Sequence, residues 1–233
     1  MPQDFVTDIK TLRERARKHI ENGAVTEGYK ADRETVVLLA AGGYSRSRRT
    51  TVMPQDFVTD IKTLRERARK HIENGAVTEG YKADRETVVK LLNEALATEL
   101  VCVLRYKLHY FMAQGIHSQA VAAEFLEHAN EEQGHADQIA ARIIQLQGTP
   151  NMNPDGLTTR SHSEYKEAGP LVDMIKENLI AERIAIESYS EMARYFGEKD
   201  PTTRRMIEGI LAMEEEHAED LASLLATLDP SKG

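Results

Sequence analysis

Two stretches, Glu132-Gln133-Gly134-His135 and Glu214-Glu215-Glu216-His217, decide how this chain folds. Each is a Glu-x-x-His pattern within a long run of helical periodicity. Because an α-helix has about 3.6 residues per turn, residues three apart lie on the same face. Each stretch therefore directs one carboxylate and one imidazole toward a common point.

Each stretch is matched by a glutamate upstream. Glu99 precedes Glu132 by 33 residues, and Glu182 precedes Glu214 by 32. The apolar residues around all four glutamates recur at spacings of three and four, which is typical of the inward face of a helix in a bundle. We therefore predict an all-α protein whose main domain, residues 84–229, is an antiparallel four-helix bundle.

The predicted helices are bounded by residues that start or stop helices. The first begins near Asp84 and the second near Ser118, the third ends at Gly197, and the fourth opens at Asp200-Pro201. Between the second and third lies a crossover from Gly148 to Pro170, rich in Asn, Pro, Gly, Thr and Ser. A connection of this length can travel along the bundle and return to the end where it started.

The N-terminal part of the chain contains a perfect repeat, because residues 1–37 recur unchanged at 53–89. Repeat architectures drift in sequence and need at least three copies, so we interpret residues 1–52 as a duplicated segment and linker rather than a domain. Residues 53–83 predict a short amphipathic helix that ends at Asn74-Gly75 and docks into a groove on the bundle. Its expected apolar face consists of Phe57, Ile61, Leu64, Ala68 and Ile72.

Charge and cysteine content exclude several classes of protein. The net charge is −8; residues 1–37 and 53–89 are each neutral and 38–52 carry three Arg and no acid, so residues 90–233 carry −11. An acidic body suits cations better than nucleic acid. Cys102 is the only cysteine, which excludes a disulfide framework and a four-cysteine metal site. No apolar run is long enough to cross a membrane, and we expect a cytoplasmic protein.

Buried glutamates are the reason to expect metal ions. Four carboxylates between apolar residues would repel one another, and burial would cost free energy, unless cations neutralised them. Carboxylate and imidazole ligands suit iron, manganese or zinc. Neighbouring polar residues are assigned to the solvent-exposed rim of the bundle: Glu127, His128, Glu131, Glu215, Glu216 and Glu219.

Residues 90–228, about 60% of the chain, resemble the bacterioferritin branch of the ferritin-like family. The resemblance is carried by TELVCVLRYKLHY (98–110), EEQGHADQIAARIIQLQGTPN (131–151), LIAERIAIESY (179–189) and MEEEHAEDL (213–221). It implies two irons per subunit, with manganese or zinc as possible substitutes. Glu99 and His135 would hold one iron, Glu182 and His217 the other, and Glu132 and Glu214 would bridge them.

Three further residues matter to the resemblance. Tyr106 matches a family tyrosine that hydrogen-bonds a ligand carboxylate, and it is our candidate catalytic residue besides the ligands. Gln133 stands where haem-binding bacterioferritins have a methionine ligand, so we expect no haem of that kind. Dps-like relatives with such a site often carry a cysteine pair near it, whereas this chain has Cys102 alone.

The resemblance implies iron storage and detoxification by a ferroxidase that oxidises Fe(II) with O2 or H2O2 and deposits Fe(III) in a homo-oligomeric shell. The chain stops soon after the fourth helix, so we expect no fifth helix, which leaves shells of 12 or 24 subunits open. Two alternatives remain. One is a rubrerythrin-like peroxide reductase, and the other is a Dps-like DNA-protecting protein that would use the basic residues of the N-terminal part, although we expect no nucleic-acid partner.

Overall fold

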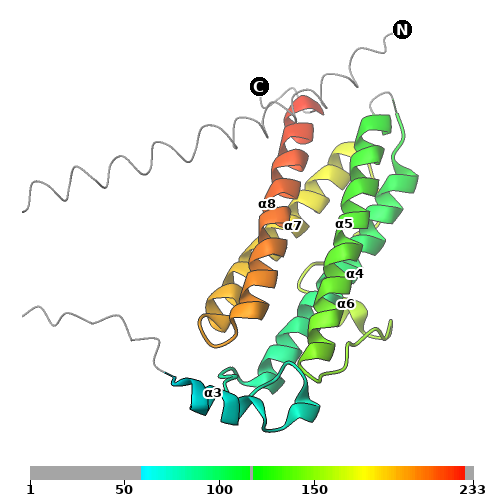
Figure 1. Ribbon diagram of the computed structural model, residues 1–233. Coiled ribbons are helices and arrows are strands. Elements are labelled where there is room, and N and C mark those ends of the chain that lie inside the picture. Colours follow the sequence, from blue (N-terminus) through cyan, green and yellow to red (C-terminus); the bar gives the residue numbers. More distant parts are fainter. Residues whose placement is uncertain (1–58, 116–117, 229–233) are drawn as a thin grey trace, which may run out of the picture. The chain divides into compact units, whose positions relative to one another are not determined.

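Four long helices form the bundle in the computed structural model, which describes residues 59–115 and 118–228 (Figure 1). They are α4 (Arg85–Met112), α5 (Ser118–Gln145), α7 (Leu171–Phe196) and α8 (Pro201–Leu228). α4 packs mainly against α5, and α7 mainly against α8, so the bundle consists of two helical hairpins. The predicted all-α fold class is confirmed. None of the described helices combines the length and apolar character needed to cross a lipid bilayer.

The junction between α7 and α8 is built as the sequence predicts. Gly197 ends α7 with a φ of +47°, a conformation that glycine adopts without strain. Pro201 opens α8, where a missing backbone N–H costs nothing. The Asp200 carboxylate accepts a hydrogen bond from the Thr203 backbone N–H at 3.0 Å and pairs with Arg142 of α5 at 2.9 Å. This end of the second hairpin is therefore tied to the first.

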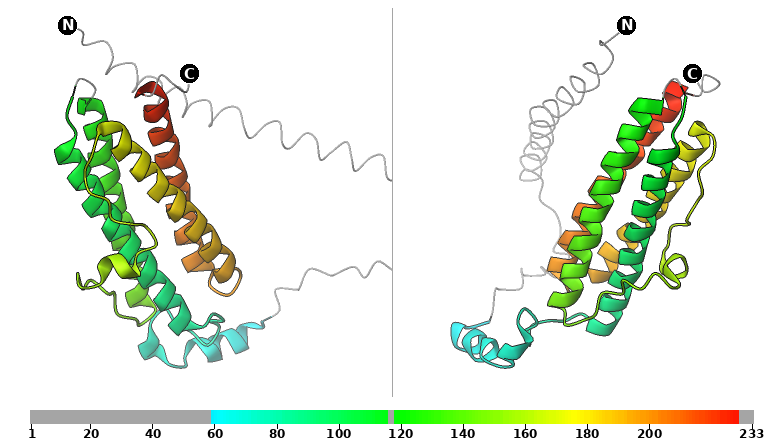
Figure 2. Two further views of the ribbon diagram at one scale, coloured as in Figure 1. Left: turned by 180° about the vertical axis from the view of Figure 1, so that it is seen from behind. Right: turned by 90° about the vertical axis from the view of Figure 1, so that its right-hand side faces the viewer.

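The crossover between α5 and α7 runs along the length of the bundle and contains the short helix α6 (Leu157–Arg160) (Figure 2). Buried Arg105 of α4 holds it in place, because its guanidinium donates to the Glu164 carbonyl at 2.8 Å and to Asn178 Oδ1 at 2.9 Å. The Thr98 hydroxyl accepts a hydrogen bond from the His162 backbone N–H at 2.9 Å. The long return path is thus fixed to α4 by polar contacts.

The apolar core has two parts on either side of a polar layer. Along α4, Leu92 and Leu96 belong to one part and Cys102 and Tyr106 to the other. Glu99 lies between them on the same helix and is 1% exposed. The bundle therefore surrounds a band of ionisable side chains with apolar packing on both sides.

The N-terminal helix α3 (Ile61–Ala68) departs from the prediction. It ends at Ala68, and Ile72–Asn74 form a separate 3-10 turn instead of continuing it to Asn74-Gly75. The expectation that this helix docks into a groove of its own subunit is wrong, because none of its residues is buried and Ile61 is 65% exposed. Phe57 and residues 1–52 lie outside the described residues.

Gly148 provides a test of packing at the C-terminal end of α5. A Cβ at this position would lie 2.6 Å from Cγ1 of Val89. Valine has few alternative rotamers, so we expect Gly148→Ala to lower the free energy of unfolding by about 1–3 kcal/mol. Gly209→Ala is the matched control, because no atom lies within 4 Å of its added Cβ, and it should gain up to about 1 kcal/mol. Urea denaturation of the metal-free protein measures both, and equal stabilities would contradict the prediction.

Candidate metal centre

Six side chains that the sequence singled out meet in the polar layer of the bundle. Each long helix contributes a glutamate, and α5 and α8 each add a histidine one turn further along. All six are buried, and each glutamate is at most 1% exposed. The residues are Glu99 of α4, Glu132 and His135 of α5, Glu182 of α7, and Glu214 and His217 of α8.

These side chains form two overlapping groups of potential ligands. One group contains Glu99 and His135, and the other contains Glu182 and His217. Glu132 and Glu214 belong to both. In each group the candidate ligand atoms lie within 4.8 Å of one another, so each group has the size of a single-ion site.

The two shared glutamates direct one oxygen to each group. Glu132 Oε2 lies 3.5 Å from His135 Nδ1, while its Oε1 lies 3.4 Å from His217 Nδ1. Glu214 does the same, with Oε1 at 3.1 Å from His135 Nδ1 and Oε2 at 3.5 Å from His217 Nδ1. This is the geometry of two carboxylates positioned to bridge two ions.

The donor set fits divalent cations. Seven buried atoms of these residues have no hydrogen-bond partner within the described part of the chain, and all six residues contribute. Buried polar atoms are normally satisfied, so such a cluster needs an explanation. Oxygen and imidazole ligands without thiolate suit iron, manganese or zinc. The atoms are Glu99 Oε2, Glu132 Oε1, His135 Nδ1, Glu182 Oε2, Glu214 Oε1 and Oε2, and His217 Nδ1.

Without metal, the carboxylates and imidazoles perturb one another's protonation. Burial, followed by the charges of Glu132 and Glu214, raises the pKa of Glu99 and of Glu182 well above the usual value. Burial also acts on Glu132, but contacts with Glu99, His135 and His217 outweigh it and hold the pKa of Glu132 well below its usual value.

Both imidazoles are shifted in the opposite sense from that expected of a buried histidine. Burial disfavours the charged ring, yet contacts with the surrounding glutamates outweigh it and raise the pKa of His135 to about 12. The same balance, led by Glu132 and Glu214, raises the pKa of His217 to about 12. In the metal-free protein, protons on the two imidazoles thus supply positive charge that bound metal ions would otherwise supply.

Two tyrosines support the terminal glutamates. The Tyr106 hydroxyl donates a hydrogen bond to Glu182 Oε1, and the Tyr189 hydroxyl donates one to Glu99 Oε1. Each hydrogen bond crosses from one hairpin to the other. Tyr106 was predicted from the sequence, whereas Tyr189 was not singled out there. Tyr189 follows Glu182 by seven residues, as Tyr106 follows Glu99, and that equal spacing was the available signal.

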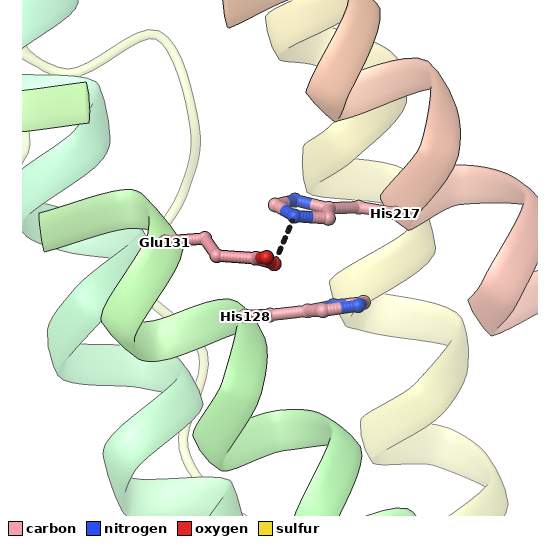
Figure 3. A group of neighbouring side chains, drawn as sticks. All are labelled: His128, Glu131 and His217. Atoms are coloured by element: carbon pink, nitrogen blue, oxygen red, sulfur yellow. Dashed lines mark hydrogen bonds and ion pairs between the residues drawn. The ribbon is translucent and has the colours of Figure 1, made fainter. Parts of the chain in front are cut away.

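His128 of α5 was assigned wrongly to the exposed rim, whereas Glu131 does lie at the rim, with a side chain that is 37% exposed. His128 is 1% exposed, and its ring stacks on that of His217 with centroids 4.1 Å apart. Glu131 accepts a hydrogen bond from His217 Nε2 at 2.9 Å, as Figure 3 shows. This bond leaves Nδ1 of His217 facing the six-residue cluster, so Glu131 orients a candidate ligand.

Comparison with known proteins agrees with this architecture. A sequence profile of the Ferritin family, described as Ferritin-like domain, matches residues 89–230. The chain belongs to this ferritin-like family. The match covers all six clustered residues and the four long helices apart from the first four residues of α4. The predicted resemblance is confirmed at the level of the family.

Relatives within the ferritin-like family include two kinds of protein. The bacterioferritin of Rhodobacter capsulatus is 30% identical over 144 residues, which cover 61% of this chain and 84% of that protein. A nutrient stress-induced DNA-binding protein of a Synechococcus strain is 29% identical over 138 residues, or 58% of this chain and 78% of that protein.

Among solved structures, the dodecameric thioferritin of Bacteroides fragilis, described as a bacterioferritin-related protein, is 35% identical with a TM-score of 0.62. The match covers 65% of this chain and 91% of that one. Dps from Thermosynechococcus elongatus is 22% identical with a TM-score of 0.59, covering 60% and 91%. At that identity, the likeness to Dps concerns the fold alone.

Because both imidazoles hold protons in the metal-free state, metal binding at their Nδ1 atoms must release them. We expect at least two protons per chain to leave when Zn(II) fills the centre, and affinity to rise as pH increases. Calorimetric titrations in buffers of different ionisation enthalpy measure this number. His162→Gln, on the crossover, is the control and should leave it unchanged. An observed enthalpy independent of the buffer would contradict the prediction.

Proposed function

We propose that this protein is a ferroxidase that binds two Fe(II) ions at Glu99, Glu132, His135, Glu182, Glu214 and His217, oxidises them and stores the product. The observation that supports this most strongly is the pair of shared glutamates, each with one oxygen toward either histidine. Two bridging carboxylates hold ions close enough to act together. The bacterioferritin relatives support iron storage as the biological context.

The reaction is proposed with Fe(II) as substrate and O2 or H2O2 as oxidant. Two ferrous ions give one electron each; O2 with two protons leaves as H2O2, or H2O2 with two protons leaves as two waters. Glutamate oxygens accommodate the increase in charge, because a carboxylate changes from terminal to bridging binding with little movement. The buried setting strengthens these electrostatic interactions.

We assign to Tyr106 and Tyr189 the positioning of the two terminal glutamates. Each hydroxyl donates to one carboxylate oxygen and leaves the other directed at the cluster. Burial, followed by the neighbouring glutamate charges, raises the pKa of both phenols well above the usual value, so both keep their hydrogen at neutral pH. Such outer hydrogen bonds fix ligand orientation and support metal affinity.

We also propose that chains assemble into a closed shell, since storage requires an enclosed space and a single bundle has none. The dodecameric state of the Bacteroides fragilis thioferritin supports a shell of 12 subunits, and native mass spectrometry would determine the number. Gln133 of this chain is exposed and donates a hydrogen bond to Asp137. It offers no thioether, so a haem ligand of the bacterioferritin kind is not part of the proposal.

The two alternatives are weaker on chemical grounds. A rubrerythrin-like reductase of the usual kind brings a second iron site held by four cysteines, and this chain has one cysteine. DNA protection has support in the Synechococcus relative and in the exposed basic residues Arg65 and Arg67 of α3. The acidic body opposes it.

Stoichiometry tests the ferroxidase proposal. Metal-free protein is loaded anaerobically with Fe(II) and then exposed to oxygen, and the rapid phase should oxidise about two Fe(II) per chain, as the two overlapping ligand groups require. Glu132→Gln or Glu214→Gln should reduce its rate by a factor of roughly 100 or more, because each removes a bridge. Glu216→Gln, an exposed neighbour on α8, is the control. A rapid phase that survives both bridge variants would rule out the proposed centre.

DNA binding is tested separately by gel retardation of duplex DNA across a salt series. We expect no retardation at physiological salt, because repulsion between the acidic body and the phosphates outweighs the basic residues of α3. Retardation that is lost in Arg65→Ala/Arg67→Ala would favour the DNA-protecting alternative.

A further inference from the structure

Three more side chains of the kinds that ligate metals meet beside the six-residue centre, and none of them belongs to it. They are Glu124 and His128 of α5 and Asp220 of α8. His128 Nε2 lies 3.4 Å from Glu124 Oε1 and 4.0 Å from Asp220 Oδ2. We propose that these three side chains bind one further divalent transition-metal ion per chain.

The two nitrogens of His128 face different partners. Its Nδ1 lies 3.2 Å from the Tyr106 hydroxyl oxygen, and that hydroxyl also donates a hydrogen bond to Glu182. The Nε2 atom lies on the other side of the ring and faces the carboxylates of Glu124 and Asp220. A buried imidazole nitrogen that faces two carboxylates has the composition of a transition-metal site.

The surroundings of this site differ from those of the two-ion centre. The His128 side chain is 2% exposed, whereas those of Glu124 and Asp220 are 16% and 33% exposed. An ion held here would be anchored by a buried imidazole and would keep water on its open side. One nitrogen and two carboxylates suit Zn(II), Fe(II), Mn(II) or Co(II) rather than Mg(II), which prefers oxygen ligands.

The two hairpins of the bundle are alike at the centre but differ at this point. Glu132 and His135 correspond to Glu214 and His217 at a spacing of 82 residues along the chain. At the same spacing, the polar residues of α5 and α8 that surround His128 have counterparts without a carboxylate or an imidazole, so the other hairpin face cannot form a second copy of this site. Glu124, His128 and Glu131 correspond to Met206, Ile210 and Met213, and Asp220 corresponds to Gln138.

The proposed site lies next to only one of the two ligand groups of the centre, the group that contains His217. The His128 and His217 rings stack with an interplanar angle of 21°, and Figure 3 shows them one above the other beside Glu131. The imidazole of His217 thus separates the third ion from the centre.

Zinc stoichiometry tests the proposal on the full chain. Metal-free protein is dialysed against Zn(II) and the bound metal is counted, with helical circular dichroism as the check on folding. We expect three ions in the parent, two in Glu124→Gln/Asp220→Asn, and one in Glu132→Gln/Glu214→Gln. Asp137→Asn/Glu215→Gln removes the same charges from exposed positions on the same helices and should retain all three.

The outcomes separate this proposal from the proposed function. Equal zinc counts in the parent and in Glu124→Gln/Asp220→Asn would overturn the third site, and two rapidly oxidised Fe(II) per chain in both would leave the ferroxidase proposal standing. A single zinc in the parent that is lost in Glu124→Gln/Asp220→Asn would support the third site and contradict the two-ion centre.

Discussion

Mutual repulsion among four buried carboxylates is the constraint around which this bundle is arranged. Glu99, Glu132, Glu182 and Glu214 lie together where solvent does not screen them. In the metal-free state, protons reduce this repulsion. They are held by the two imidazoles and by the carboxyls of Glu99 and Glu182, and the pKa values of all four groups are raised. Apolar packing on both sides of the layer provides the free energy that keeps these groups buried.

The same constraint explains the polar residues around the layer. Tyr106 and Tyr189 each take up one oxygen of a terminal carboxylate, which reduces the number of unsatisfied buried atoms. Glu131 takes the outer nitrogen of His217. These contacts leave the inner oxygen atoms and the Nδ1 atoms directed toward the two overlapping groups, so the unsatisfied groups are already arranged as a preorganised site for two ions would need them.

Much of this was predictable from the sequence, because helical periodicity and helix-breaking residues are local signals. They located the four long helices, and the periodicity placed Glu99, Glu132, Glu182 and Glu214 on their inward faces. His128 was missed because its neighbour Ala129 also faces inward, and periodicity does not determine which of two adjacent residues is buried more deeply. The position of α3 depended on tertiary contacts, which its amphipathic pattern does not specify. That the six residues ligate metal stays a prediction.

Because α4 packs mainly on α5 and α7 on α8, each hairpin contributes half of the candidate ligands: Glu99, Glu132 and His135 from one, and Glu182, Glu214 and His217 from the other. An ion bound to both sets of residues would link the two hairpins across their interface. Iron that binds only to the assembled bundle would add to its free energy of unfolding, and this contribution grows with the logarithm of the free metal concentration. The iron supply would then determine how stably the two hairpins stay together, as well as the chemistry of the centre. When iron is scarce, the protein would open first at the interface between the α4–α5 and α7–α8 hairpins.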